Sequence, residues 1–291
     1  MKVNKLALAI GVTFTALATT PSYALIISTS VQSSAFVTHS GLPAATDLDG
    51  PASSVYSYAE SYDNGTGGYT YATGDDTGYS DLFTAASVYD EVASASAGAK
   101  ILHTAVITND SVSAQNIDFN FLISGGRVDS FQGFWLGGFN STEAGVTADI
   151  RVNGLSLWNS SAAIGYSGGG LSVTLGGTDL GGTEDWNSYT WGNYNGFLNL
   201  GSLAAGASFT LEYELNTYVN LYLSESGYAA ARISDPFDFN SSPLFAIDNF
   251  TTTPTNTGNP AEVPEPANTL LLGAGLAALA FRRRKERKSN A

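Results

Sequence analysis

The sequence predicts an all-β fold, an antiparallel β-sandwich, for most of this 291-residue chain. Three observations lead to that prediction. Apolar and polar residues alternate with a period of two in several segments, which is typical of strands that bury one face. Turn residues recur between those segments, and the chain contains 32 glycines. No segment of the central region shows the 3.6-residue period of a helix.

The clearest strand patterns lie near the middle of the chain. In residues 101–108 two sets of side chains alternate, namely Ile101, His103, Ala105 and Ile107 with Leu102, Thr104, Val106 and Thr108. A turn at 109–111 follows. A second strand is expected at 117–123, where isoleucine and phenylalanine alternate with polar residues. A third strand is expected at 209–215, after the turn-like segment 201–208.

Two segments do not follow the strand pattern. Residues 61–81 and 176–196 are rich in glycine and aromatic residues, and we expect long loops or hairpins there. The order of the strands AKILHTAVITNDS, NIDFNFLI and LAAGASFTLEY is similar to that in immunoglobulin-like modules of bacterial surfaces. A jelly roll would produce the same pattern, so both types of sandwich stay open.

The first 24 residues are typical of a secretory signal peptide. Lys2 and Lys5 precede an apolar stretch at residues 6–17, and the small residues Ser22 and Ala24 follow it. This order of basic, apolar and small residues predicts cleavage after Ala24 and export of the remaining chain. The apolar stretch is too short to span a bilayer permanently.

The rest of the chain divides into a body, a linker and an anchor. The body is expected at residues 25–250, either as one part or as two parts with a break near residue 95. A polar linker at 251–263 contains prolines and has no periodicity. In the anchor, residues 264–291, an apolar run of about 15 residues would form a helix about 22 Å long, against a hydrocarbon core of about 30 Å. We expect a single short transmembrane helix here, with its basic end on the cytoplasmic side.

This terminal segment resembles the PEP-CTERM sorting signal of Gram-negative bacteria. The resemblance depends on three elements in order, namely two prolines around a glutamate, a short apolar helix and a basic end. The residues that show it are Pro264, Glu265, Pro266, Arg282, Arg283 and Arg284. It implies recognition by an exosortase, cleavage near the motif and transient anchoring in the inner membrane. It also implies a host that makes exopolysaccharide, with the body delivered to the outer surface or the biofilm matrix.

The body has a strongly negative charge. Of the 12 basic residues only Lys100, Arg127, Arg151 and Arg232 lie between the two end segments, against all but two of the 26 acidic residues. The body therefore has a net charge of about −20, which argues against nucleic acid as a partner. The chain has no cysteine, so disulfides, zinc–thiolate sites and thiol nucleophiles are excluded.

No catalytic site is predicted, and we expect that the protein is not an enzyme. The G-x-S-x-G pattern at residues 165–169 lacks the following helix that a serine-hydrolase elbow needs. The sequence offers few candidates for the base of a catalytic triad, because His39 and His103 are the only histidines and His103 is expected to pack within a strand. Glu212 and Glu214 share one side of a strand, but alternation places that side in water.

Two binding sites are considered, one for a sugar and one for calcium. Ring faces and nearby asparagines could bind a sugar in the segment that contains Trp186, Tyr189, Trp191 and Tyr194. Core or cross-strand packing is the alternative for these rings. Calcium is left open because acidic residues lie in glycine-rich loops, at Asp179, Glu184 and Asp185 and at the pairs Asp47/Asp49 and Asp75/Asp76. None of them fits a known calcium-loop pattern, and no other cofactor is expected.

We therefore expect an exported protein of the cell surface or exopolysaccharide matrix, with a structural or adhesive role and with sorting by an exosortase. A carbohydrate-binding surface module is the first alternative function, and a secreted hydrolase is the second. The expected partners are the export machinery, an exosortase and extracellular polysaccharide.

Overall fold

The computed structural model describes residues 25–64, 66–75, 79–89, 93–132, 141–167, 170–223, 226–235 and 250–255. The chain divides into two units, residues 1–254 and 255–291. The predicted signal peptide, the predicted C-terminal helix and the six predicted sorting residues lie outside the described residues, as does most of the predicted linker. No helix within the described ranges is long and apolar enough to cross a membrane.

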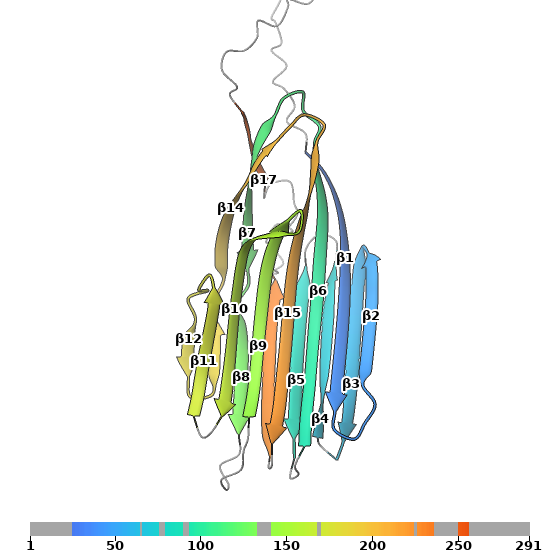
Figure 1. Ribbon diagram of the computed structural model, residues 1–291, viewed down its shortest axis with the longest axis vertical. Coiled ribbons are helices and arrows are strands. Elements are labelled where there is room, and N and C mark those ends of the chain that lie inside the picture. Colours follow the sequence, from blue (N-terminus) through green and yellow to red (C-terminus); the bar gives the residue numbers. More distant parts are fainter. Residues whose placement is uncertain are drawn as a thin grey trace, which may run out of the picture. The chain divides into compact units, whose positions relative to one another are not determined.

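Every regular element in the described residues of the first unit is a β-strand (Figure 1). The strands are β1 (Leu25–His39), β2 (Ala45–Ala52), β3 (Ser54–Asp63), β4 (Thr66–Asp75), β5 (Ser80–Val88), β6 (Ala93–Asn109), β7 (Gln115–Ile123), β8 (Gly126–Gln132), β9 (Ser141–Val152), β10 (Leu155–Ser167), β11 (Gly170–Gly177), β12 (Thr183–Asp185), β13 (Ser188–Trp191), β14 (Tyr194–Leu203), β15 (Ser208–Leu223), β16 (Gly227–Asp235) and β17 (Phe250–Pro254). Neighbouring strands pair antiparallel throughout. The predicted all-β antiparallel fold is confirmed.

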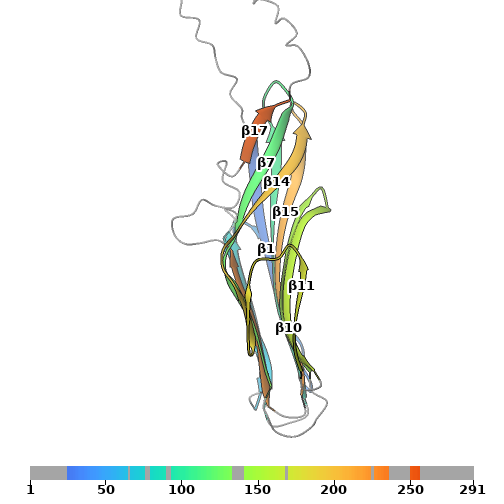
Figure 2. The same cartoon turned by 90° about the vertical axis from the view of Figure 1, so that its left-hand side faces the viewer.

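The strands form three sheets. Sheet A has the order β11-β10-β9-β15-β6-β1-β2, sheet B has the order β12-β13-β8-β16-β5-β4-β3, and sheet C has the order β14-β7-β17. Sheets A and B face each other as two layers of a sandwich (Figure 2). In sheet A, β6 pairs with β1 on one side and with β15 on the other. Strands from before and after residue 95 therefore belong to the same sheets.

Sheet C continues the layer that sheet B begins. Its order, β14-β7-β17, repeats the order β13-β8-β16 within sheet B, and each of its strands is the sequence neighbour of its counterpart. The strands β1, β6 and β15 of sheet A have 15, 17 and 16 residues, and both sheets lie along them (Figures 1 and 2). Sheets B and C therefore both pack against sheet A.

The interior consists of alternate residues of each strand, as the sequence pattern predicts. In β6, Ile101, His103, Ala105 and Ile107 are fully buried, and the residues between them face outward. The same alternation runs through β15, where Leu211 and Leu215 are fully buried. Burial of one apolar side chain stabilises a fold by about 1.5–3 kcal/mol, so this periodic face is the main source of stability.

Among the described residues, buried polar contacts cross the interior from sheet A to sheet B. They join Ser33 to Ser57, Thr217 to Thr84, Thr142 to Ser130, and His103 to Ser80. Each contact supplies a hydrogen-bond partner to buried polar groups, and burial of such groups without partners is costly. Because hydrogen bonds are directional, these contacts also favour one alignment of the two sheets.

Aromatic rings fill the space between sheet C and sheet A. Phe119 in β7 stacks on Phe250 in β17, with ring centroids 4.9 Å apart. Phe121 in β7 meets Trp158 in β10 edge to face at 5.0 Å, and Trp158 stacks on Tyr194 in β14 at 5.8 Å. The two contacts of Trp158 attach sheet C to sheet A, whereas the Phe119–Phe250 contact lies within sheet C.

The individual strand predictions are confirmed with longer bounds. The segment 101–108 lies within β6, 117–123 lies within β7, and 209–215 lies within β15. The strands β6 and β7 follow each other in the chain but belong to different sheets. The two glycine-rich segments form hairpins, β3–β4 and β12–β13, which is one of the two forms expected for them.

Candidate functional site

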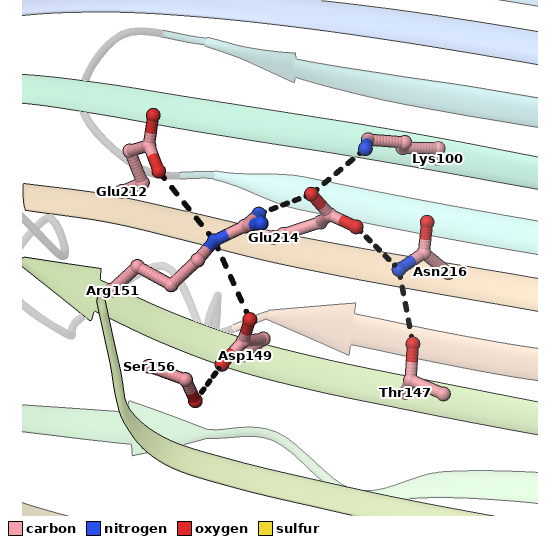
Figure 3. A network of polar contacts seen from close by, with 8 residues as sticks. All are labelled: Lys100, Thr147, Asp149, Arg151, Ser156, Glu212, Glu214 and Asn216. Atoms are coloured by element: carbon pink, nitrogen blue, oxygen red, sulfur yellow. Dashed lines mark hydrogen bonds and ion pairs between the residues drawn. The ribbon is translucent and has the colours of Figure 1, made fainter. Parts of the chain in front are cut away.

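The densest polar cluster among the described residues surrounds Arg151 on the outer face of sheet A (Figure 3). Arg151 lies in β9, and β15 lies next to it in the sheet. The direct partners of Arg151 are Asp149 on its own strand and Glu212 and Glu214 on β15. The sequence brings these groups together because residues two apart in a strand share one face.

The distances show that Glu214 is the most connected member of this cluster. Its carboxylate accepts a hydrogen bond from the Arg151 guanidinium, and its Oε2 lies 2.8 Å from the Lys100 Nζ. The Asn216 side-chain amide donates to the other Glu214 oxygen at 3.1 Å and to the Thr147 hydroxyl at 3.0 Å. The Arg151 Nε lies 3.5 Å from Glu212 and 3.4 Å from Asp149.

The electrostatics of the cluster favour ionised carboxylates. Burial alone would raise the pKa of Glu214, but hydrogen bonds from Lys100, Asn216 and Arg151 outweigh burial and hold that pKa below its ordinary value. The pKa of Arg151 is raised by the three acids although burial opposes the rise. A general acid needs a carboxyl group whose pKa is raised towards neutrality, and the pKa of Glu214 is shifted in the opposite direction. The arrangement fits a surface ion-pair network.

The other groups considered for hydrolysis lie apart from this cluster. Ser167 ends β10 and pairs with Gly170 at the start of β11, so the G-x-S-x-G segment connects two strands of a hairpin. A strand follows where a hydrolase elbow has a helix. His103 is buried, as predicted, with its Nε2 2.5 Å from the Ser80 hydroxyl, and burial lowers its pKa to about 4. His39 ends β1 and is also buried.

The four aromatic residues of the predicted sugar site do not share one surface. Tyr189 and Trp191 are only 4% and 3% exposed, so their ring faces belong to the core, and Tyr194 packs on Trp158. Trp186 is 64% exposed. Glycines explain the burial, because a Cβ on Gly182 would lie 2.3 Å from the Tyr189 ring and one on Gly126 would lie 2.1 Å from the Trp191 ring. Of the four, Trp186 alone offers a largely exposed ring.

The three acids of the predicted calcium site are placed in and beside the β12–β13 hairpin. The Asp179 carboxylate accepts from the Gly181 backbone N–H at 2.8 Å, and the Asp185 carboxylate accepts from the Trp186 N–H at 2.7 Å. Glu184 lies in β12 opposite Tyr189. Within the described ranges, no three His, Asp or Glu residues are grouped closely enough to hold a metal ion. The calcium hypothesis therefore stays a prediction without a ligand set in this structure.

Sequence reasoning missed an aromatic surface on the outer face of sheet B. Tyr58, Tyr71 and Phe83 lie opposite one another across β3, β4 and β5. A second row contains Tyr62 in β3, Tyr228 in β16 and Phe131 in β8, with Gly67 and Ser87 between Tyr62 and Tyr228. The exposed ring of Trp186 stands edge to face with Phe131 at 5.9 Å. The period-two tyrosines of residues 56–71 were the available signal.

Comparison with known proteins identifies the segment that follows the sandwich. Residues 262–285 match the PEP-CTERM protein-sorting motif. No curated protein and no solved structure matches the chain, so the likeness to immunoglobulin-like modules is not shown. The matched residues include the Pro-Glu-Pro sequence and the first three arginines of the basic end. The chain therefore carries a PEP-CTERM sorting motif at residues 262–285, and this motif implies export, sorting at the membrane and processing by an exosortase.

Proposed function

We propose that the sandwich is a non-catalytic structural or adhesive unit of the cell surface or exopolysaccharide matrix. The observation that supports this proposal most is the presence of the sorting motif at residues 262–285 behind an all-β body. The motif explains how the body reaches the outside, and the body supplies a rigid two-layer unit. A signal peptide at residues 1–24 and a short membrane helix complete the proposed route.

The composition of the body suits a role outside the cell. Its net charge of about −20 keeps the chain soluble and disfavours binding to anionic surfaces. The absence of cysteine means that its stability comes from core burial and not from disulfides. The ion pairs around Arg151 neutralise acids on the outer face of sheet A, which keeps that face folded without forming an acid–base pair.

A test of this proposal compares cells that make the wild-type chain with cells that make a Glu265→Ala, Arg283→Ala variant. The variant should stay in the inner membrane, and the extracellular polysaccharide matrix should lose cohesion to the same extent as in a deletion strain. A matched control is Lys100→Ala, which removes one cation from the sandwich and leaves the motif intact. Normal matrix cohesion in the deletion strain would contradict the structural role.

A carbohydrate-binding role is the second candidate, and one observation favours it. Trp186, Phe131 and Tyr228 are exposed by 64%, 36% and 41% and adjoin one another on the outer face of sheet B. Aromatic side chains with a polar group beside them suit binding of a sugar, and Arg127 lies on the same face, paired with Asp129 at 2.6 Å. This location differs from the loop that the sequence suggested, because only Trp186 belongs to both.

The second candidate is tested by polysaccharide pull-down of the purified exported chain. Trp186→Ala should reduce retention on the matrix polysaccharide by about 10-fold or more, as expected for loss of one stacking ring. The control Tyr222→Ala removes a similarly exposed ring from the outer face of sheet A and should have no effect. Equal retention of all three proteins would exclude the aromatic surface as a sugar site.

A further inference from the structure

The two lateral sides of the sandwich differ in how their edge strands are protected. On one side the edge strands are β2 of sheet A and β3 of sheet B, and on the other side they are β11 and β12. An unprotected edge strand has free N–H and C=O groups along its length and tends to pair with another chain. The chemistry of each side therefore decides whether it can associate.

The β2–β3 side is closed by two aspartates. Asp47 and Asp49 lie opposite the buried residues Ala35 and Ser33, so their side chains point inward from β2. The Asp47 carboxylate accepts the backbone N–H of Tyr58 at 2.9 Å, and the Asp49 carboxylate accepts that of Tyr56 at 2.9 Å. Both N–H groups belong to the edge strand β3. An incoming strand would have to displace these charged acceptors, which disfavours pairing here.

The β11–β12 side has no such protection in the part of the chain that the structure describes. β11 pairs with β10 along its whole length and is the last strand of sheet A. Its sequence, GLSVTLGG, contains no charged residue and no proline. On the facing sheet the edge strand β12 has only three residues. This uncharged edge strand of eight residues is thus open to pairing.

The apolar residues of β11 are incompletely covered. Val173 and Leu175 lie opposite Ile164 and Ala162, which are fully or almost fully buried, so they point to the inner side of sheet A. Leu175 is nevertheless 45% exposed. Leu171 and Val173 are half-buried at the rim of the core. A further strand added beside β11 would cover these apolar side chains. It would also form hydrogen bonds with the backbone N–H and C=O groups at the free edge of β11.

We propose that β11 pairs antiparallel with β11 of a second copy of this chain, so that sheet A continues from one protomer into the other. The closed β2–β3 side disfavours a head-to-tail arrangement, and two β11 edges can meet about a two-fold axis. With the axis at Val173, Leu171 lies opposite the partner subunit's Leu175, and Ser172 lies opposite the partner subunit's Thr174. The apolar row and the hydroxyl row each continue across the junction, and no charge is brought to it.

A second copy fits this edge better than an unrelated strand because β11 is self-complementary in that register. Each inward apolar residue meets an inward apolar residue, and each outward hydroxyl meets an outward hydroxyl. The inference goes beyond the proposed function, because pairing in solution is measured whatever the destination of the protein.

Cysteine cross-linking tests the pairing directly, because the chain has no cysteine of its own. The exported chain with Val173→Cys should form a disulfide-linked dimer under mild oxidation, since directly opposite strand residues lie within disulfide range. The control Leu48→Cys places an exposed thiol on the closed β2–β3 side and should remain monomeric. Equal cross-linking of the two variants would overturn the proposal.

Light scattering without cross-linking provides the second measurement. The wild-type exported chain should be a dimer at about 100 µM, and Leu175→Lys should raise the dimer dissociation constant about 100-fold, because a lysine would face an apolar side chain. Leu48→Lys should leave the constant unchanged, and urea unfolding of each variant shows that the fold is kept. A monomeric wild-type chain at this concentration, or an unaffected dimer in Leu175→Lys, would refute the β11 pairing.

Discussion

The hydroxyl oxygens of Thr84 in β5 and Thr217 in β15 lie 2.7 Å apart and join sheet B to sheet A inside the sandwich. The Thr84 hydroxyl also lies 2.8 Å from that of Thr70, which bonds to the Phe83 carbonyl oxygen at 2.9 Å. A chain of hydroxyls therefore leads from one sheet to a backbone acceptor of the other. Such a buried network stabilises one alignment when every member has a partner.

Replacement of Thr217 by valine should destabilise the fold by about 1–3 kcal/mol, because it leaves the buried Thr84 hydroxyl with one partner fewer. Thr217→Ser keeps the hydroxyl and should cost less. Urea unfolding of the purified exported chain measures both effects. Thr108→Val is the control, since its bond to Ser208 is exposed and should contribute little. Equal losses at positions 108 and 217 would show that the buried chain has no special role.

His103 should make the free energy of unfolding fall with pH between about 6.5 and 4, a range that begins above the pKa values of carboxylates. Burial lowers its pKa from 6.5 to about 4 in the folded chain. Between those values the unfolded chain binds a proton that the folded chain does not bind, so stability falls as the pH falls from about 6.5 to 4. The loss should reach about 3 kcal/mol by pH 4.

The measurement is urea unfolding at a series of pH values between 7 and 4 for wild type and His103→Asn. The variant should lose this part of the pH dependence and keep any part that belongs to the acids. The same slope in both proteins would mean that His103 is not the titrating group.

Arg151 should matter more for stability than other arginines of the body. Arg151→Met leaves Asp149, Glu212 and Glu214 close together with Lys100 as their remaining nearby cation, and should cost about 1–2 kcal/mol at low salt. The loss should shrink in 0.5 M salt because screening weakens repulsion between the acids. Arg127→Met is the matched control, since Arg127 is more exposed and forms its ion pair with Asp129 on the outer face of sheet B. A larger loss at Arg127 would contradict this account.

Glu214 should contribute to stability at neutral pH and lose that contribution in acid. Its pKa is lowered in the folded chain, since hydrogen bonds from Lys100, Asn216 and Arg151 outweigh the effect of burial. Its contribution is therefore complete above the unfolded value of 4.5 and is lost as the pH falls through the lower folded value. Unfolding of Glu214→Gln below pH 4 should show a smaller pH dependence than wild type. An unchanged slope would show that Glu214 is not held in its ionised form.

The alternation of apolar residues was sufficient to predict two strands of sheet A, β6 and β15. Residues 101–108 and 209–215 have one buried and one wet face, and that pattern has few other interpretations. The aromatic outer face of sheet B was not predicted. Its tyrosines lie in a glycine-rich segment that resembles a loop, and they alternate with small residues and not with the large apolar residues that mark a buried strand face. The pairing of strands distant in sequence, such as β1 with β6, follows from the packing of whole sheets, which no local pattern encodes.

The predicted sugar site shows why side-chain type alone misleads. Tyr189 and Trp191 occur in a glycine-rich segment, where exposed rings are plausible, yet Gly182 and Gly126 provide the space that takes both rings into the core. Gly126 is distant in sequence from Trp191, so the two cannot be matched before the strands are aligned. The sorting motif was predictable because its three elements are consecutive in the chain and need no tertiary contact.

The intact mass of the exported protein, measured from cells with and without an active exosortase, shows whether both ends of the chain are removed. With the exosortase, the product should begin at Leu25 and lack the residues beyond the Pro-Glu-Pro motif. Without it, the chain should retain those residues and stay with the inner membrane. A product that keeps the whole segment 262–285 in cells with an active exosortase would contradict the account.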